Sequence, residues 1–185
     1  EYVAAFKAAF PKDKQPVSYD NMAQAIGAFE RKLVTPSRWD KFLNGDQSAL
    51  TDAEKAGFNM FVDTGCGSCH MGAYVGGNIY QKLGVVKPYP ETKDIGRAKV
   101  TGSDGDKYIF KVPSLRNIEK TGPYFHTGKT ATLDEAIYRM ADYQLGKQLK
   151  PEEVKAIATW LSTLTGEIPV DYIQKHPGRF PLLHI

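Results

Sequence analysis

The chain has 185 residues, of which 42% are hydrophobic and two are cysteines, and its formal net charge is +3. This length suits one domain, or one domain with an added arm. The charge is small and spread along the chain, which favours neither nucleic acid nor an anionic membrane as a partner, and no apolar run is long enough to span a membrane.

The first third of the chain predicts helices. A helical pattern starts at Glu1 and ends at Pro11, and Ser18 is the expected N-cap of a second helix. This second helix carries one apolar stripe, in which Met22 is expected to pack in the core. The stripe consists of Met22, Ile26, Phe29 and Leu33. No signal peptide is visible, so either it has been removed or the chain is part of a longer protein, and the abrupt start of the helical pattern favours the second.

A third helix leads into the motif that dominates the sequence. Thr51 and Glu54 predict a capping box at the start of this helix. The helix runs into Cys66-Gly67-Ser68-Cys69-His70, which is the attachment pattern of a c-type haem. In that arrangement each thiol bonds to one haem vinyl group, and the histidine becomes an axial ligand of the iron.

Three other interpretations of the motif are a redox dithiol, half of a zinc site and a chance match. A redox dithiol is expected beside a strand–helix–strand pattern, whereas a helix precedes Cys66. A zinc site needs further ligands nearby. The remaining histidines are far away in sequence: His126, His176 and His184.

A long irregular segment follows the motif. Residues 72–112 contain seven glycines and little helical periodicity, although Tyr108 to Val112 predict a short strand. Long loops in compact domains are usually functional, and a loop can wrap the edge of a haem. Next, Pro113 begins a predicted helical turn, and its carbonyl is expected to accept the His70 ring N–H. Arg116 has two interpretations, a partner of a haem propionate or a solvated surface charge.

Met140 is the expected second axial ligand. It follows a predicted capping box, Thr132 with Glu135, on the apolar face of a helix. Plain core packing is the alternative role for such a methionine. Its competitors as ligand are His126, Met60 and Met22. Met71 adjoins His70 and cannot reach the opposite face of the same iron.

The last helix begins at Lys150-Pro151, carries an apolar stripe from Val154 to Leu164, and is expected to end at Gly166. Residues 167–185 contain three prolines and predict an extended arm with an apolar end. The fold prediction is therefore an all-α, cytochrome c-type haem domain with long glycine-rich loops and a C-terminal extended arm.

An ordered set of motifs resembles the C-terminal half of the bacterial di-haem cytochrome c peroxidases. The resemblance covers nearly the whole chain except the arm. The matching stretches are residues 19–21, 25–30, 33–37, 65–70, 112–117, 121–126 and 140–146.

The resemblance implies a division of roles. This half carries the high-potential haem, with His70 and Met140 as iron ligands, and the backbone carbonyls of Thr121 and Pro123 hold a Ca²⁺ ion. Residues 1–18 pack toward a missing N-terminal domain with a second, peroxidatic haem, residues 19–166 form the haem domain, and residues 167–185 form the arm.

The resemblance also implies a function and partners. The donor is a periplasmic c-type cytochrome or a cupredoxin, and the whole protein, a homodimer, reduces hydrogen peroxide to water in the periplasm. This half alone transfers electrons only. One alternative is a freestanding mono-haem electron carrier. Another is a relative of the di-haem enzymes that mature tryptophan-derived quinone cofactors, in which Tyr143 becomes the suspected distal ligand.

Overall fold

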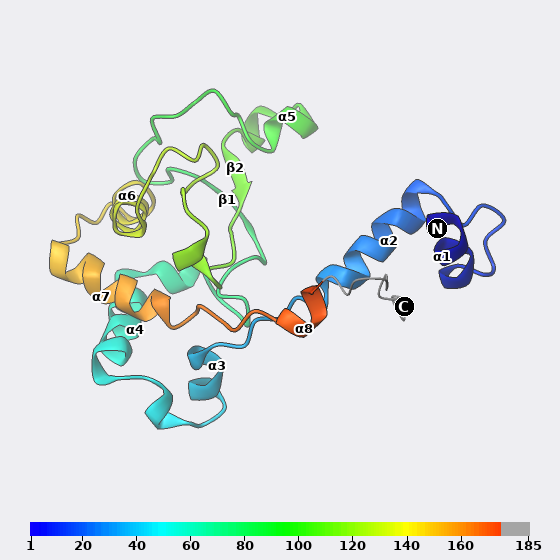
Figure 1. Ribbon diagram of the computed structural model, residues 1–185. Coiled ribbons are helices and arrows are strands. Elements are labelled where there is room, and N and C mark those ends of the chain that lie inside the picture. Colours follow the sequence, from blue (N-terminus) through cyan, green and yellow to red (C-terminus); the bar gives the residue numbers. More distant parts are fainter. Residues whose placement is uncertain (175–185) are drawn as a thin grey trace. The chain divides into compact units, whose positions relative to one another are not determined.

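The computed structural model describes residues 1–174, in which the regular secondary structure is mainly helical (Figure 1), as predicted. His176, His184 and most of the expected arm lie outside the described residues. The elements follow in the order α1 (Tyr2–Ala9), α2 (Tyr19–Glu30), α3 (Arg38–Leu43), η1 (Gln47–Ala49), α4 (Asp52–Thr64), η2 (Cys66–Ser68), β1 (Tyr80–Lys82), α5 (Ala98–Thr101), η3 (Asp104–Asp106), β2 (Ile109–Lys111), η4 (Ile118–Lys120), α6 (Leu133–Leu145), α7 (Pro151–Ser162) and α8 (Val170–Ile173). Over residues 1–174, every helix is too short or too polar to cross a membrane.

The described chain divides into two compact units. Residues 1–35 and 167–174 belong to one unit, and residues 36–166 form the other. Within the first unit, the ring of Tyr172 stacks on Phe29 at a centroid distance of 5.2 Å, and its hydroxyl donates to the Phe29 carbonyl. The expected boundary after residue 18 therefore falls inside this unit.

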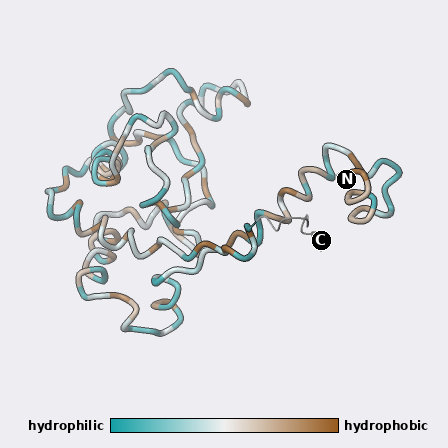
Figure 2. Tube along the Cα trace, in the orientation of Figure 1, coloured by the Kyte–Doolittle hydropathy of each residue, from teal (hydrophilic) through white to brown (hydrophobic). Residues whose placement is uncertain are grey.

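The first unit differs from the sequence expectations in two respects. Hydrophobic residues do recur along α2 (Figure 2), but Met22, Ile26 and Leu33 of the stripe are 42%, 50% and 40% exposed. The prediction that Met22 packs in the core is thus wrong in the described structure. In addition, the start of the expected extended arm contains the short helix α8, which follows Pro169.

The core of the second unit forms where α4 packs against α7. A Cβ atom added at Gly57 of α4 would lie 2.1 Å from the carbonyl oxygen of Ala156 on α7. The missing side chain therefore allows the two helices to approach closely. Beside this contact, Trp160 is 1% exposed and its ring meets Trp39 edge to face at 5.4 Å. These aromatic groups belong to the apolar core of the unit, against which Cys66 packs.

Local capping signals are mostly confirmed. Ser18 accepts a hydrogen bond from the Asn21 backbone, and Thr51 and Glu54 form a reciprocal capping box. At α6, Thr132 accepts from the Glu135 backbone as expected. The reciprocal half of this second box is replaced, because the Glu135 carboxylate binds Arg139 instead.

The segment 72–112 contains the sheet. β2 confirms the predicted strand, and it pairs with β1 in an antiparallel two-stranded sheet in which Tyr80 faces Lys111. The expected helical turn at residues 113–117 is instead irregular, and a short 3₁₀ helix follows at Ile118–Lys120. α7 ends at Ser162, four residues before the predicted Gly166, which forms a bridge with Ser37.

Candidate haem-binding site

The haem motif follows a sharp turn at the end of α4. Gly65 adopts a left-handed conformation with φ of 101°, which favours glycine, and it terminates the helix. The chain then forms η2, and the backbone N–H of His70 donates to the carbonyl of Cys66 at 3.0 Å. This compact turn presents both cysteines and the histidine to the same side.

The two thiols are suited to attachment rather than to redox cycling. Cys66 and Cys69 are free and half-buried. Burial raises the pKa of Cys66 to about 11. Dithiol oxidoreductases require a thiol with a lowered pKa, so this environment argues against that alternative. Within residues 1–174 no group of three or more His, Cys, Asp or Glu side chains is placed to hold a metal ion, which also weakens the zinc interpretation.

A cavity of about 550 Å³ opens beside the motif. Its volume lies in the ordinary range for bound cofactors, about 300–1,000 Å³. Its walls are mainly apolar, as a porphyrin requires. They come from the motif, from the sheet, from the segment after β2, and from α6 and α7; among the lining residues are Cys66, Cys69, His70, Phe110, Pro113, Phe125, Ile137, Met140, Leu145 and Leu161.

His70 is half-buried and lines this cavity. Its Nδ1 atom is buried and has no hydrogen-bond partner in the described structure. Burial lowers the pKa of His70, and the backbone groups of Val75 and Pro113 partly oppose this shift. A neutral imidazole is the form that binds a metal, so the environment suits an iron ligand.

The Pro113 carbonyl lies near the His70 ring, but the expected hydrogen bond from the ring is not formed in the described structure, where His70 Nδ1 has no partner. A Cβ atom added at Gly76 would be 2.2 Å from the Pro113 carbonyl oxygen and 3.0 Å from His70 Nδ1. Both atoms therefore border the space that glycine leaves empty. Gly76 was not singled out from the sequence, because its importance depends on two neighbours that are distant along the chain.

Met140 and His126 are the two expected second ligands that line the cavity. Met22, Met60 and Met71 do not line it, and the Met71 side chain is 48% exposed. His126 stacks on Phe110 with a centroid distance of 4.2 Å and an interplanar angle of 22°. Met140 comes from α6, which also contributes Ala136, Ile137 and Leu145 to the cavity lining.

The rival distal ligand, Tyr143, is directed elsewhere. Its ring packs edge to face on Tyr89 at 5.2 Å, and its side chain does not line the cavity. Its carbonyl accepts hydrogen bonds from the backbone of Val86 and Lys87. The neighbouring Gln144 also binds this loop, accepting from Gly84 N–H at 2.8 Å. These contacts fix the end of α6 near Met140, a role that the sequence did not predict.

Arg116 is not placed with the other predicted site residues. It lies outside the cavity lining, and its guanidinium forms two hydrogen bonds with Asp40, at 2.7 and 2.8 Å. Neither sequence interpretation, propionate partner or solvated charge, describes this ion pair, whose side chains are 18% and 29% exposed. The partner was missed because it is 76 residues away in sequence.

Thr121 and Pro123, the expected calcium positions, line the same cavity and are exposed in the described structure.

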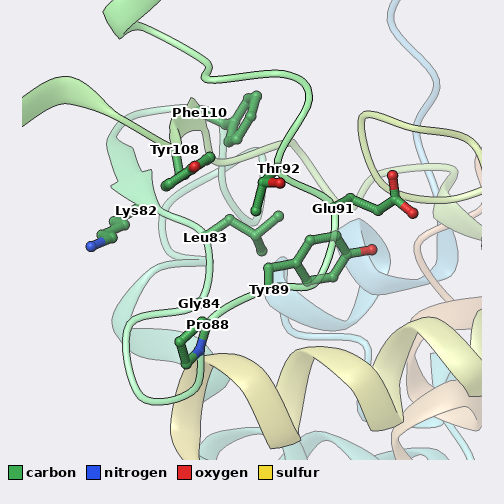
Figure 3. Close-up of a pocket in the computed structure, with 9 residues that line it drawn as sticks. All are labelled: Lys82, Leu83, Gly84, Pro88, Tyr89, Glu91, Thr92, Tyr108 and Phe110. Atoms are coloured by element: carbon green, nitrogen blue, oxygen red, sulfur yellow. The ribbon is translucent and has the colours of Figure 1, made fainter. Parts of the chain in front are cut away.

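A second, smaller cavity of about 260 Å³ adjoins the first and shares Lys82, Leu83 and Phe110 with it (Figure 3). Tyr89, Tyr108 and Phe110 supply aromatic surface there. Lys82 and Lys111 are the lysines on the larger cavity's lining, and both come from the sheet.

A Cys-x-x-Cys-His turn that faces an apolar cavity defines a c-type cytochrome domain. The chain belongs to the cytochrome c family, whose model matches residues 54–165. A second model, described as di-haem cytochrome c peroxidase, matches residues 1–48. The resemblance inferred from the motifs is thereby confirmed.

Similar proteins support the same grouping. The chain is 48% identical over 172 residues to cytochrome c551 peroxidase of Nitrosomonas europaea, covering 91% of this chain and 51% of that protein. It is 46% identical to cytochrome c551 peroxidase of Pseudomonas aeruginosa, covering 93% and 51%. A solved structure described as a MauG-like protein associated with microbial copper homeostasis matches with a TM-score of 0.72 at 28% identity, over 88% of this chain and 57% of that one. The chain thus spans about half the length of the curated relatives it matches.

Proposed function

We propose that this chain is the electron-transfer haem domain of a di-haem cytochrome c peroxidase. The observation that supports the proposal most is the single apolar cavity that Cys66, Cys69, His70 and Met140 all line. The relatives that are 46–48% identical are named peroxidases, and this chain covers half of each.

The proposal gives each of these residues a role. The two cysteines would hold the haem by thioether bonds, and His70 and Met140 would bind its iron. The haem bound there would supply one-electron transfer, and a neutral thioether ligand would favour the reduced state. With Met140 as the second protein ligand, the iron held by this chain alone would have no open position for peroxide.

Within the larger protein, the domain receives electrons from a small c-type cytochrome or a cupredoxin. It passes them to a peroxidatic haem in the part of the protein that precedes this domain, where peroxide is reduced to water. That reaction needs an open iron and groups that transfer protons. The proposal includes a periplasmic location, a homodimer and a Ca²⁺ ion bound by the carbonyls of Thr121 and Pro123.

A pair of variants tests the ligand assignment. In the oxidised holoprotein, Met140→Ala is expected to abolish the absorption band that arises from charge transfer between methionine sulfur and iron, and to lower the midpoint potential. His126→Ala is the matched control, because His126 lines the same cavity. It is expected to keep the band. An unchanged spectrum and potential in Met140→Ala would refute Met140 as a ligand.

A freestanding electron carrier is the second candidate. It is favoured by the fact that all residues lining the cavity lie between positions 61 and 161, inside one compact unit. The two candidates differ in peroxide turnover with a reduced small cytochrome as donor. A longer natural protein that contains this chain and a second haem shows turnover under the first proposal, and a natural protein with this haem alone shows none.

A further inference from the structure

The ion pair between Arg116 and Asp40 lies next to the segment that carries Gly76. Asp40 is on α3, where it also accepts hydrogen bonds from the backbone and hydroxyl of Ser37, each at 2.8 Å. The carboxylate is therefore fixed to a helix that belongs to the core of its unit. Arg116 binds both carboxylate oxygens, an arrangement that fixes orientation as well as distance.

Arg116 connects this anchor to the segment after His70. Its Nε–H donates to the carbonyl of Ala73 at 2.8 Å. Next to it, the hydroxyl of Ser114 donates to the Tyr74 carbonyl at 2.6 Å, and the Leu115 N–H donates to the Val75 carbonyl at 3.1 Å. Three consecutive residues, 73–75, are thus bonded to three consecutive residues, 114–116.

These bonds hold together the two segments that lie next to the His70 ring. Residues 73–75 lead directly into Gly76, and residues 114–116 follow directly on Pro113. Gly76 and the Pro113 carbonyl are close enough that a methyl group on Gly76 would collide with the oxygen. Movement of either segment therefore changes the position of the Pro113 carbonyl relative to His70 Nδ1.

We propose that Arg116 and Asp40 are positioning residues for His70: they clamp segment 73–75 to segment 114–116, and this keeps the Pro113 carbonyl at the His70 ring. The inference rests on the proposed function, because it assumes that His70 is the iron ligand. His70 Nδ1 has no hydrogen-bond partner in the described structure, but with His70 bound to iron the nearby Pro113 carbonyl would accept the ring N–H, fix the tautomer and raise the basicity of the ligating nitrogen. A more basic ligand would stabilise Fe(III), so loosening the clamp is expected to raise the midpoint potential.

Helix α3, which carries Asp40, also supplies a closely matched control. Arg38 also binds a carboxylate through two nitrogens, Glu54 at 2.5 and 2.9 Å, and it also donates to one backbone carbonyl, that of Ala49 at 3.2 Å. Both arginines thus make three hydrogen bonds of the same kinds. Unlike Arg116, Arg38 makes none of these bonds with residues 73–77 or 113–116.

The experiment compares Arg116→Gln with Arg38→Gln in the full-length holoprotein. The midpoint potential and the hyperfine-shifted proton resonances of the axial histidine are measured together with the free energy of unfolding. We expect both variants to lose stability, but only Arg116→Gln to move the histidine resonances and shift the redox equilibrium toward Fe(II). A tenfold shift corresponds to ~59 mV for one electron.

Equal effects of the two variants on potential and resonances, or a lowered potential in Arg116→Gln, would overturn the inference. If Arg116→Gln does not fold, Asp40→Asn and Glu54→Gln form a second matched pair. Only Asp40→Asn is then expected to change the histidine resonances and the potential, and equal effects of the two variants would overturn the inference. Failure of the proposed function is separate, since it appears in the wild type as absence of covalent haem.

Discussion

The space beside Gly76 allows a quantitative test of the site. In Gly76→Ala, the new Cβ would lie 2.2 Å from the Pro113 carbonyl oxygen, and the residue would keep a φ of 119°, which L side chains rarely adopt. The backbone strain costs about 1–3 kcal/mol. The collision with a backbone oxygen costs about another 1–3 kcal/mol. Together these are a large part of a typical folding free energy of about 5–15 kcal/mol.

The matched control is Gly45→Ala. Gly45 has a φ of 103°, yet a Cβ added there would have no atom within 4 Å. It therefore reports the strain without the collision. Denaturant unfolding of the holoproteins is expected to show a greater loss in Gly76→Ala, by about 1–3 kcal/mol, together with a changed haem spectrum. Equal losses with an unchanged spectrum would refute the placement of Pro113 at His70.

Three further predictions concern packing, pH and the rival ligand. Gly57→Ala is expected to destabilise the α4–α7 contact by about 1–3 kcal/mol in thermal unfolding, whereas Gly105→Ala, whose nearest atom would be 3.6 Å away, is expected to have little effect; similar losses would contradict the packing. The hydrogen bond from Arg38 lowers the pKa of the Glu54 carboxyl from 4.5 to about 2. The unfolded chain therefore binds this proton more tightly than the folded chain does, and the free energy of unfolding decreases as the pH falls from about 4.5 toward 2. Acid titrations should show a smaller loss in Glu54→Gln, and an unchanged titration would contradict this. Tyr143→Phe is expected to keep the wild-type haem spectrum, and a changed spectrum would revive tyrosine as distal ligand.

Features that depend on neighbours in the sequence were predictable. The caps at Ser18 and Thr51 require partners only three residues away, and the haem motif is complete within five residues. The second capping box was half wrong because Arg139, one turn further along α6, attracts the Glu135 carboxylate. Short-range patterns thus identify candidate bonds, but they do not decide between competing partners.

Features that depend on distant segments were not predictable in the same way. The partner of Arg116 is on α3, and the close approach of Gly76 to Pro113 appears only after the loop folds back. Met22 belongs to a stripe with helical spacing, yet spacing alone does not say what covers a helix face. The cavity narrows the choice of second iron ligand. Met140 and His126 both line it, whereas Met22 does not.

The central claim is that this chain carries one covalently bound haem on Cys66 and Cys69. Intact mass spectrometry together with a haemochrome assay on the purified chain measures the haem-to-chain ratio directly. The account predicts one haem per chain of this sequence, and none covalently attached after replacement of both cysteines by serine. A wild-type chain at its bare polypeptide mass, matured under conditions that attach haem to a known c-type cytochrome, would contradict it.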